Sequence, residues 1–295
     1  MVDMNMRGLY PILAMPFDDA GMIDTEDLEH EVEFAIDAGV DGVGLALGSE
    51  ILKLTDAERD LATRTVVDKV AGRVPVVVNT GAQGNDLAVF HSRRAQDLGA
   101  DAVMAAPPLG ISGQPRLVKD YFVRISEAIS VPIFMQDIET APVSPALAGQ
   151  IAGETENARY AKMETAPTPA RIGEAVEGAG GALVVFGGYG GYYLLDELKR
   201  GSVGTMPHCA VPDGFRSVLD LFGQGRVDEA EDEFNRYGPV FRLIGSDLSS
   251  FAVVKEILVV RGVFTTANTR QPSVPPDEVT RAEIRRVVDK LGLET

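Results

Sequence analysis

Short apolar segments alternate with longer amphipathic segments along most of the chain. Several of the short segments are almost continuously apolar, as is typical of parallel strands buried on both faces. The segments that predict β-strands are Pro11–Pro16, Gly42–Ala46, Val74–Asn79, Ala102–Ala105, Val131–Met135, Ala158–Lys162, Ala182–Phe186 and Ser202–Met206.

Segments with helical spacing lie between these strands. Two of them begin with N-terminal signals, Thr25-Glu26-Asp27 and the capping box Thr55-x-x-Glu58. The helices expected here are Thr25–Ala38, Thr55–Val70, Asn85–Leu98, Arg116–Ile129, Pro145–Ile151, Thr168–Glu177 and Tyr192–Arg200. Eight strand–helix units predict an α/β fold, a (β/α)₈ barrel. A doubly wound sheet would instead carry an early glycine-rich fingerprint, whereas Phe17-Asp18-Asp19 follows the first strand.

The pattern changes after the eighth strand, where helices follow one another without strands. These helices are expected at Asp213–Phe222, Val227–Leu243, Leu248–Val260 and Pro276–Leu291, with a polar loop over Thr265–Pro275. No low-complexity linker separates them from the preceding part. We therefore predict a catalytic barrel over residues 1–210 and a C-terminal helical extension over residues 211–295, packed on the barrel as one structural unit.

Composition narrows the function classes. The 295 residues are 45% hydrophobic and carry a formal net charge of −17. Such an acidic chain lacks the basic surface that nucleic acid or an anionic membrane attracts. Cys209 is the only cysteine, and Met1–Gly8 lacks the apolar core of a signal peptide. We expect a soluble, cytoplasmic protein with no nucleic-acid or membrane partner.

Barrels of this type carry their catalytic residues at the carboxyl ends of the strands. The sixth predicted strand ends in Lys162, and Glu164 follows two residues later. Burial disfavours an ammonium group, and a neutral amine is the nucleophile that attacks a carbonyl. Residues two apart in an extended chain point the same way, so the Glu164 carboxylate is expected beside the amine, where it would relay protons. The pattern favours a Schiff base between Lys162 and a 2-oxo acid.

A simpler interpretation gives Lys162 no chemistry: its amine reaches solvent, and Glu164 is an ordinary ion-pair partner. Pattern alone leaves both interpretations open. Among the other lysines the serious rival is Lys255, in the apolar segment Phe251–Lys255, which we expect to pack in a helix with its amine in water. The lysines expected at the surface are Lys53, Lys69, Lys119, Lys199 and Lys290.

Several short segments, each weak alone, occur in a specific order. They are Gly8–Phe17, Gly48-Ser49-Glu50, Leu54-Thr55-x-x-Glu58-Arg59, Val74–Ala82, Pro107-Pro108, Val131-Pro132-Ile133, Lys162 and Gly187-Gly188. Together they make nearly the whole chain similar to the dihydrodipicolinate synthase and N-acetylneuraminate lyase family of class I aldolases. The resemblance implies a TIM barrel, usually a homotetramer, that uses Lys162 as its Schiff-base lysine.

The chain departs from the usual pattern of this family at several site positions. Ala46-Leu47-Gly48-Ser49-Glu50 stands where a Gly-Thr-Thr-Gly-Glu motif is usual. Met135 is placed at the catalytic tyrosine, with Leu47 and Leu109 at the other members of its hydroxyl relay. Thr140 takes the place of an arginine that holds the second substrate. These departures argue against the tyrosine-based aldol mechanism and against lysine-biosynthetic specificity.

One branch of the family is similar in these departures. It lacks the tyrosine, carries a glutamate two residues after the lysine, and dehydrates 2-keto-3-deoxy sugar acids such as L-2-keto-3-deoxyarabonate. Lys162-Met163-Glu164 has this spacing. The resemblance therefore implies a hydro-lyase rather than an aldolase.

Other residues are expected to bind the substrate. Ser49, with the backbone N–H groups of Gly48 to Glu50, would grip the carboxylate, although a turn serine bonded to its own backbone is an equal alternative. Gly187 and Gly188 would let substrate approach the backbone, with the Gly187 carbonyl available, or would simply form a turn. The remaining expected contacts are Met135, Gln136 and His208, for which solvated or structural roles are the alternative.

Neither a metal nor a cofactor is expected. No His, Cys, Asp and Glu residues have metal-binding spacing, and Gly187–Gly191 lacks the ending of a phosphate-binding loop. The sequence thus predicts a Schiff-base lyase that dehydrates a short 2-keto-3-deoxy sugar acid. The alternatives are a pyruvate-dependent aldolase of the dihydrodipicolinate synthase type and a barrel that binds a metabolite without catalysis.

Overall fold

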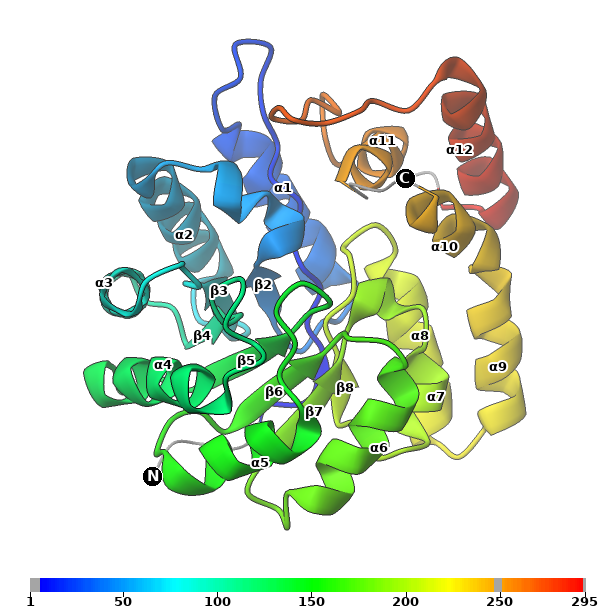
Figure 1. Ribbon diagram of the computed structural model, residues 1–295. Helices are drawn as coiled ribbons and strands as arrows, with labels where there is room; N and C mark the ends of the chain where they lie inside the picture. The colour runs from blue at the N-terminus through cyan, green and yellow to red at the C-terminus, as the bar shows by residue number, and fades with distance from the viewer. Residues whose placement is uncertain (1–5, 247–250, 294–295) are drawn as a thin grey trace. The chain divides into compact units, whose positions relative to one another are not determined.

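The computed structural model describes residues 6–246 and 251–293 (Figure 1). These residues form two compact units. The first contains residues 6–10 and Pro75–Pro207, and the second contains Pro11–Val74 and residues 208–293 without the gap. The expected division into residues 1–210 and 211–295 stays a prediction.

Parallel strands form the centre of the first unit. In chain order they are β1 (Gly8–Leu9), β3 (Val76–Asn79), β4 (Ala102–Ala105), β5 (Ile133–Asp137), β6 (Tyr160–Met163), β7 (Val184–Gly187) and β8 (Gly204–Thr205). Strands β3 to β8 pair with their chain neighbours, and β8 pairs with β1. Every residue of these strands is buried except Gly8 and Val184, which are partly exposed. This burial accounts for the apolar sequences of the strands.

A helical segment follows each of the strands β3 to β7. These segments are α3 (Asn85–Asp97), α4 (Pro115–Ala128), α5 (Pro145–Glu154), α6 (Thr168–Gly178), and the short pair η3 (Tyr189–Gly191) and α7 (Leu194–Leu198). Consecutive helices pack against each other around the strands (Figure 1). Ser144 caps α5 by accepting a hydrogen bond from the Leu147 N–H. This alternation places the carboxyl ends of neighbouring strands next to one another.

The register of the strands sorts side chains between two faces. Phe134 pairs with Tyr160, and Lys162 pairs with both Gln136 and Phe186. The rings of Phe134, Tyr160 and Phe186 contact one another. Because side chains alternate along a strand, Gln136 and Lys162 continue this aromatic face toward the carboxyl ends. The polar site therefore stands directly on an aromatic core.

The second unit contains β2 and the remaining helices. Its elements are β2 (Val43–Leu45), η1 (Leu47–Ser49), η2 (Ile51–Lys53), α1 (Thr25–Asp37), α2 (Asp56–Val70), α8 (Pro212–Gly223), α9 (Val227–Arg236), α10 (Gly238–Gly245), α11 (Phe251–Val260) and α12 (Glu278–Leu291). Ile12 forms parallel bridges with Gly44 and with His208. The predicted capping box of Thr55 and Glu58 is confirmed at the start of α2. Among the described residues, no helix is long and apolar enough to cross a membrane.

Two elements differ from the prediction. The first strand is Gly8–Leu9 rather than Pro11–Pro16, because both prolines lack the N–H that a ladder needs, and only Ile12 forms bridges there. The helix expected over Val227–Leu243 is broken at Tyr237, where Gly238 and Pro239 begin a new helix. Residues 248–250 of the helix expected over Leu248–Val260 lie outside the described residues, and α11 begins at Phe251.

Candidate functional site

Lys162 lies in the buried strand β6 with its amine beside a carboxylate. Its side chain is 5% exposed, and Nζ lies 2.9 Å from Oε1 of Glu164. Glu164 comes directly after the strand, and its N–H donates to the Asp137 carbonyl, so the extended chain continues as expected. The expected juxtaposition of the two side chains is therefore present. Their small exposure makes this a partly desolvated ion pair at the end of a strand.

Two further donors hold the Glu164 carboxylate. The Gln136 Nε2 donates to Oε2 at 2.8 Å, and the backbone N–H of Tyr189 donates to Oε1 at 2.8 Å. With the Lys162 amine, the carboxylate thus has three partners from β5, β6 and the segment after β7. Hydrogen bonds to both oxygens fix the plane of the carboxylate as well as its position.

The amide side chain of Asn79, on β3, supports Gln136. Asn79, the last residue of β3, donates through Nδ2 to Gln136 Oε1 at 3.3 Å and accepts the Gly81 N–H at 3.1 Å. Both amide side chains are 2% exposed. Because its carbonyl oxygen accepts from Asn79, the Gln136 amide is oriented with its NH₂ group toward Glu164.

Met135 does not have the place that the sequence comparison gave it. It is fully buried and pairs with Ala161 in the ladder between β5 and β6. Since neighbouring residues of a strand point to opposite faces, Met135 points away from the face of Lys162. Gln136 is the residue of β5 that stands beside the lysine. The structure therefore places Gln136, and not Met135, on the face of Lys162, and a substrate contact by Met135 stays a prediction.

Because Gly188 has no side chain, Lys162 and Glu164 can occupy the space beside it. A Cβ atom at this position would lie 2.5 Å from Lys162 Cε and 2.8 Å from Glu164 Oε1. These short distances show that the glycine is required by space. The Gly188 carbonyl accepts the Gly191 N–H, and the Gly187 carbonyl accepts the Met206 N–H. The expected contact between substrate and the Gly187 carbonyl stays a prediction.

A fully buried aspartate anchors the segments around the pair. Asp137, the last residue of β5, accepts hydrogen bonds from Thr165, from the Val143 N–H and from the Arg171 guanidinium at 3.0 Å. These contacts fix the chain on either side of Glu164 to the end of β5. Asp137 is therefore saturated by the protein, in keeping with a supporting role.

Glu197 is a second carboxyl near the pair, and sequence reasoning did not find it. It lies on α7, is 0% exposed, and its Oε2 lies only 1.8 Å from where a Cβ of Gly187 would be. Burial is the main reason that its pKa rises from 4.5 to about 8, with the charge of Glu164 adding to the effect. The carboxyl is consequently neutral at pH 7.

The second unit holds the remaining predicted substrate contacts, and there they form a tight turn. The Ser49 hydroxyl donates to the Leu13 carbonyl and accepts the Ala46 N–H at 3.0 Å. The N–H groups of Ser49 and Glu50 donate to the carbonyls of Ala46 and Leu47. Gly48 packs so closely on Ile12 that a Cβ would lie 3.2 Å from its Cγ2. These contacts match the structural alternative, and substrate binding by Gly48–Glu50 stays a prediction.

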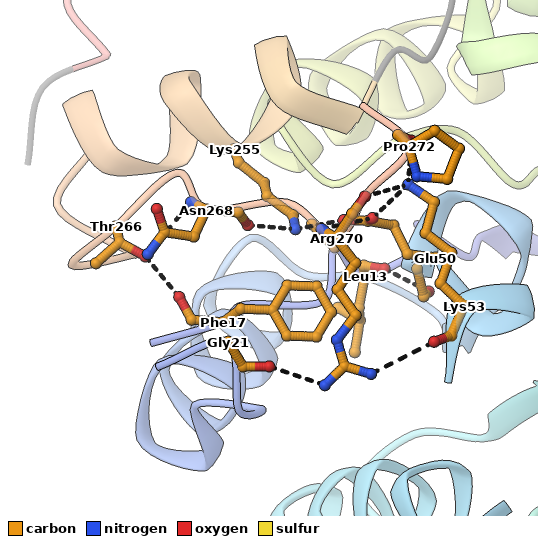
Figure 2. A network of polar contacts seen from close by, with 12 residues as sticks. Leu13, Phe17, Gly21, Glu50, Lys53, Lys255, Thr266, Asn268, Arg270 and Pro272 are labelled. Carbon is orange, nitrogen blue, oxygen red and sulfur yellow. Dashed lines mark hydrogen bonds and ion pairs between the residues drawn. The ribbon is translucent and has the colours of Figure 1, made fainter. Parts of the chain in front are cut away.

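Lys255, the rival lysine, is not in water as expected but fully buried. Its amine contacts Glu50 Oε1, donates to the Asn268 carbonyl at 2.7 Å and lies 4.5 Å from the centre of the Phe17 ring (Figure 2). Burial lowers its pKa from 10.5 to about 8, against the opposing effect of Glu50. Glu50 also binds Lys53 and the Arg270 N–H, so this cluster ties the segment after α11 to the turn after β2 (Figure 2).

His208 lies in an aromatic environment of the same unit. Its ring contacts those of Phe215 and Phe241, and its Nδ1 accepts the Ala210 N–H at 3.4 Å. Burial lowers its pKa to about 3, so the imidazole is neutral at physiological pH. This setting matches a structural histidine, and a substrate contact stays a prediction.

Taken together, the first unit supplies an amine, a carboxylate and an amide in mutual contact. An amine can attack a carbonyl, and an adjacent carboxylate can exchange protons with the resulting adduct. No group of three or more His, Cys, Asp or Glu residues suited to a metal occurs in the described part of the chain. Sequence reasoning missed Asn79, the Tyr189 N–H and Glu197. Asn79 had a signal, because it is a polar side chain at the end of an apolar strand.

The comparisons with known proteins cover nearly the entire chain. Residues 5–291 match the model of the dihydrodipicolinate synthetase family. The L-2-keto-3-deoxyarabonate dehydratase of Azospirillum brasilense is 34% identical over 97% of this chain and 94% of its own length. A 4-hydroxy-tetrahydrodipicolinate synthase of Methanococcus maripaludis is 25% identical over 98% of this chain and 99% of its own length.

A solved structure shows the same fold. It is a prophage protein of the dihydrodipicolinic acid synthase family from E. coli K12 in complex with pyruvate, with a TM-score of 0.90, 22% identity and coverage of 98% of this chain and 99% of that chain. The predicted (β/α)₈ barrel with C-terminal helices is confirmed by this likeness. The chain therefore belongs to the dihydrodipicolinate synthetase family of class I, Schiff-base-forming lyases.

Proposed function

We propose that this protein dehydrates a short 2-keto-3-deoxy sugar acid through a Schiff base on Lys162. The observation that carries the proposal is the Glu164 carboxylate, 2.9 Å from the lysine amine and held by Gln136 and the Tyr189 N–H. The residue of β5 that pairs with the lysine is Gln136, and its amide side chain has no acidic hydroxyl. The 34% identity to a 2-keto-3-deoxyarabonate dehydratase supports the same reaction class.

Imine formation begins with the ion pair. Glu164 accepts a proton from Lys162, and the neutral amine attacks the C2 carbonyl of the substrate. The protonated Glu164 then gives this proton to the C2 hydroxyl of the adduct, which leaves as water. The products of this half-reaction are a protonated imine and a carboxylate, so Glu164 is again able to act as a base.

Dehydration follows from the same arrangement. The protonated imine withdraws electrons and acidifies the C3 hydrogen, which the Glu164 carboxylate removes to give an enamine. The enamine electrons then expel the C4 hydroxyl, which takes the proton from Glu164 and leaves as water. Hydrolysis of the unsaturated imine consumes one water, releases the 2-oxo product and restores the amine, so the net change is the loss of one water.

The substrate carboxylate and hydroxyls need partners as well. Gln136 pairs with Lys162 in the ladder and donates to Glu164, and we propose that it also binds the C4 hydroxyl of the substrate. Substrate binding by Ser49 with Gly48 and Glu50, and by His208, remains a proposal. We also propose that the protein is cytoplasmic and a homotetramer, by resemblance to its family.

An aldolase of the dihydrodipicolinate synthase type is the second candidate, favoured by the full-length likeness to such synthases at 25% identity. Carbon–carbon cleavage requires removal of a proton from the C4 hydroxyl rather than its departure. We expect the protein to convert a 2-keto-3-deoxypentonate to a product lighter by one water, without release of pyruvate. Mass analysis of the products from wild type and Lys162→Ala tests this. Release of pyruvate and an aldehyde would support the aldolase instead.

The third alternative is a barrel that binds a metabolite without catalysis. Such a protein would bind pyruvate reversibly, and cyanoborohydride would leave its mass unchanged. A covalent adduct that forms with pyruvate but not with lactate would exclude this alternative, because only the ketone can form an imine.

A further inference from the structure

Three buried polar side chains without partners gather beside the proposed active site. Among the described residues, neither carboxyl oxygen of Glu197 has a hydrogen-bond partner, and the same holds for the hydroxyls of Thr168 and Thr205. These residues are 0%, 2% and 0% exposed. Buried polar atoms are normally paired, so a concentration of this kind is informative.

The ladder register places these groups around Gly187. Thr205 pairs directly with Gly187 between β7 and β8, so the Thr205 side chain lies on the face where Gly187 would have its own. The Glu197 carboxyl fills that place, with Oε2 1.8 Å from the ideal Cβ position. Thr168, at the start of α6, lies near the carboxyl without forming a hydrogen bond of normal geometry. Gly187 is thus required because Glu197 is there.

Gly188, the residue after Gly187, lies between the Glu197 carboxyl and the pair of Lys162 and Glu164. Gly188 is in contact with Lys162 Cε and Glu164 Oε1, while Gly187 is in contact with Glu197. The end of β7 therefore separates two carboxyls by the thickness of one strand. Adding a charge to Glu197 would place two like charges on either side of this backbone, near a single ammonium.

The charged groups around Glu197 are few. Burial has the largest effect on its pKa and raises it, Glu164 and the adjacent Asp196 raise it further, and Lys162 lowers it. Strands β7 and β8 contain no charged residue. On α6, Glu174 and Glu177 are exposed, and Arg171 is bound to Asp137. No described cation is therefore paired with Glu197, in agreement with a neutral acid whose pKa is about 8.

We propose that Glu197 is a positioning residue of the lyase that must remain uncharged, because it fills the side-chain space of Gly187 behind Lys162 and Glu164. This inference rests on the proposed function. Ionised Glu197 would favour the protonated form of Lys162 and would keep the proton on Glu164 more firmly. Both effects reduce the supply of neutral amine and of free carboxylate base. Imine formation is therefore coupled to the protonation of Glu197.

The test compares imine formation by wild type, Glu197→Gln and the matched control Asp196→Asn. Asp196 is the neighbouring residue, its side chain is 60% exposed, and its substitution removes the same charge. The probe is pyruvate with cyanoborohydride, and the readout is the initial rate of adduct formation between about pH 6 and about pH 9.5. Circular dichroism establishes that each variant is folded, and Glu197→Met, which is also uncharged, replaces Glu197→Gln if the amide prevents folding.

The expected ratio of Glu197→Gln to wild type is close to one at the acidic end. Because one pKa unit on the lysine corresponds to a tenfold change in neutral amine, the ratio should rise about three- to tenfold at the alkaline end. Its midpoint should lie near the Glu197 pKa of about 8. Asp196→Asn should follow wild type throughout. In parallel, the infrared difference spectrum between wild type and Glu197→Gln should contain a protonated-carboxyl band that disappears over the same range.

The possible failures can be told apart. A flat ratio with normal adduct formation by wild type, or a missing carboxyl band below neutral pH, would overturn the role of Glu197 and leave the lyase intact. Absence of any adduct in wild type at every pH would overturn the proposed function itself, and the role of Glu197 with it.

Discussion

At the scale of single residues, the site depends on how Glu164 is held. An ion-pair partner that only neutralised Lys162 would need one contact, whereas this carboxylate has three, from the amine, Gln136 and the Tyr189 N–H. A carboxylate fixed in this way is held beside the amine, where it can exchange protons with an adduct of that amine. Position and chemistry therefore agree.

Replacing Glu164 separates a proton carrier from a simple ion-pair partner. Glu164→Gln should lower turnover by about 10²–10⁴-fold, the usual contribution of a general acid–base group, while excess pyruvate still traps the enzyme completely. Glu174→Gln, on the exposed face of α6, is the control. Turnover and trapping measured across pH decide the matter. Full turnover of Glu164→Gln at every pH would mean that another group moves the protons.

At the scale of elements, the end of β7 leaves no space for a side chain at Gly187 or Gly188. Gly188→Ala would place its methyl group 2.5 Å from Lys162 Cε, and the lysine would have to move. Since a displacement of about 1 Å can cost about 10²-fold in rate, we expect a loss of this size with the fold retained. Gly153→Ala in α5 is the control, because its Cβ would meet nothing within 4 Å. Equal turnover in both variants would show that the lysine tolerates the methyl group.

The cluster around Glu50 joins α11 to the turn after β2. Lys255 and Glu50 are both 0% exposed at their side chains, and removing one member of a buried pair typically costs about 3–5 kcal/mol. Lys255→Met should therefore lower the free energy of unfolding by this amount, as measured in urea. The exposed Lys290→Met should change it little. A small effect of Lys255→Met would mean that Lys53 and the Arg270 N–H suffice to satisfy Glu50.

Much of the element pattern was predictable because it depends on local composition. Val76–Asn79 and Ala102–Ala105 are apolar runs bounded by turns, and the Thr55 capping box begins α2 as predicted. The first strand was misplaced because apolar character extends through Pro11, where the ladder loses a donor. The pattern predicts one continuous helix across Tyr237 because the hydrophobic periodicity continues there, although Gly238-Pro239 begins a new helix.

The site was only partly predictable, since it depends on contacts distant in sequence. The Lys162 and Glu164 contact follows from strand alternation alone, but the pairing of Gln136 with Lys162 needs the register between β5 and β6. Met135 and Gln136 were both expected to contact substrate, and this register places Gln136, but not Met135, on the face of Lys162. Glu197 lies on α7, and its nearness to Gly187 has no local signal.

At the scale of the whole molecule, the Glu197 carboxyl couples stability to pH. Its pKa rises from 4.5 to about 8 on folding, so the folded state binds the proton more tightly. The stabilisation is full below 4.5 and is lost as pH rises through about 8. The melting temperature of wild type should therefore fall relative to Glu197→Gln between about pH 5 and about pH 8 and stay level above that range. A constant difference would show that Glu197 does not change its proton binding on folding.

The chemistry of the whole protein depends on which lysine forms the imine. Lys162 and Lys255 are both buried beside a glutamate, but they lie in different units and only Lys162 is at the end of a barrel strand. The most direct measurement is to trap the protein with pyruvate and cyanoborohydride and to map the modified peptide by mass spectrometry. We predict that the adduct is on Lys162 and is absent from Lys162→Ala. An adduct on Lys255, with Lys162 unmodified, would contradict this account.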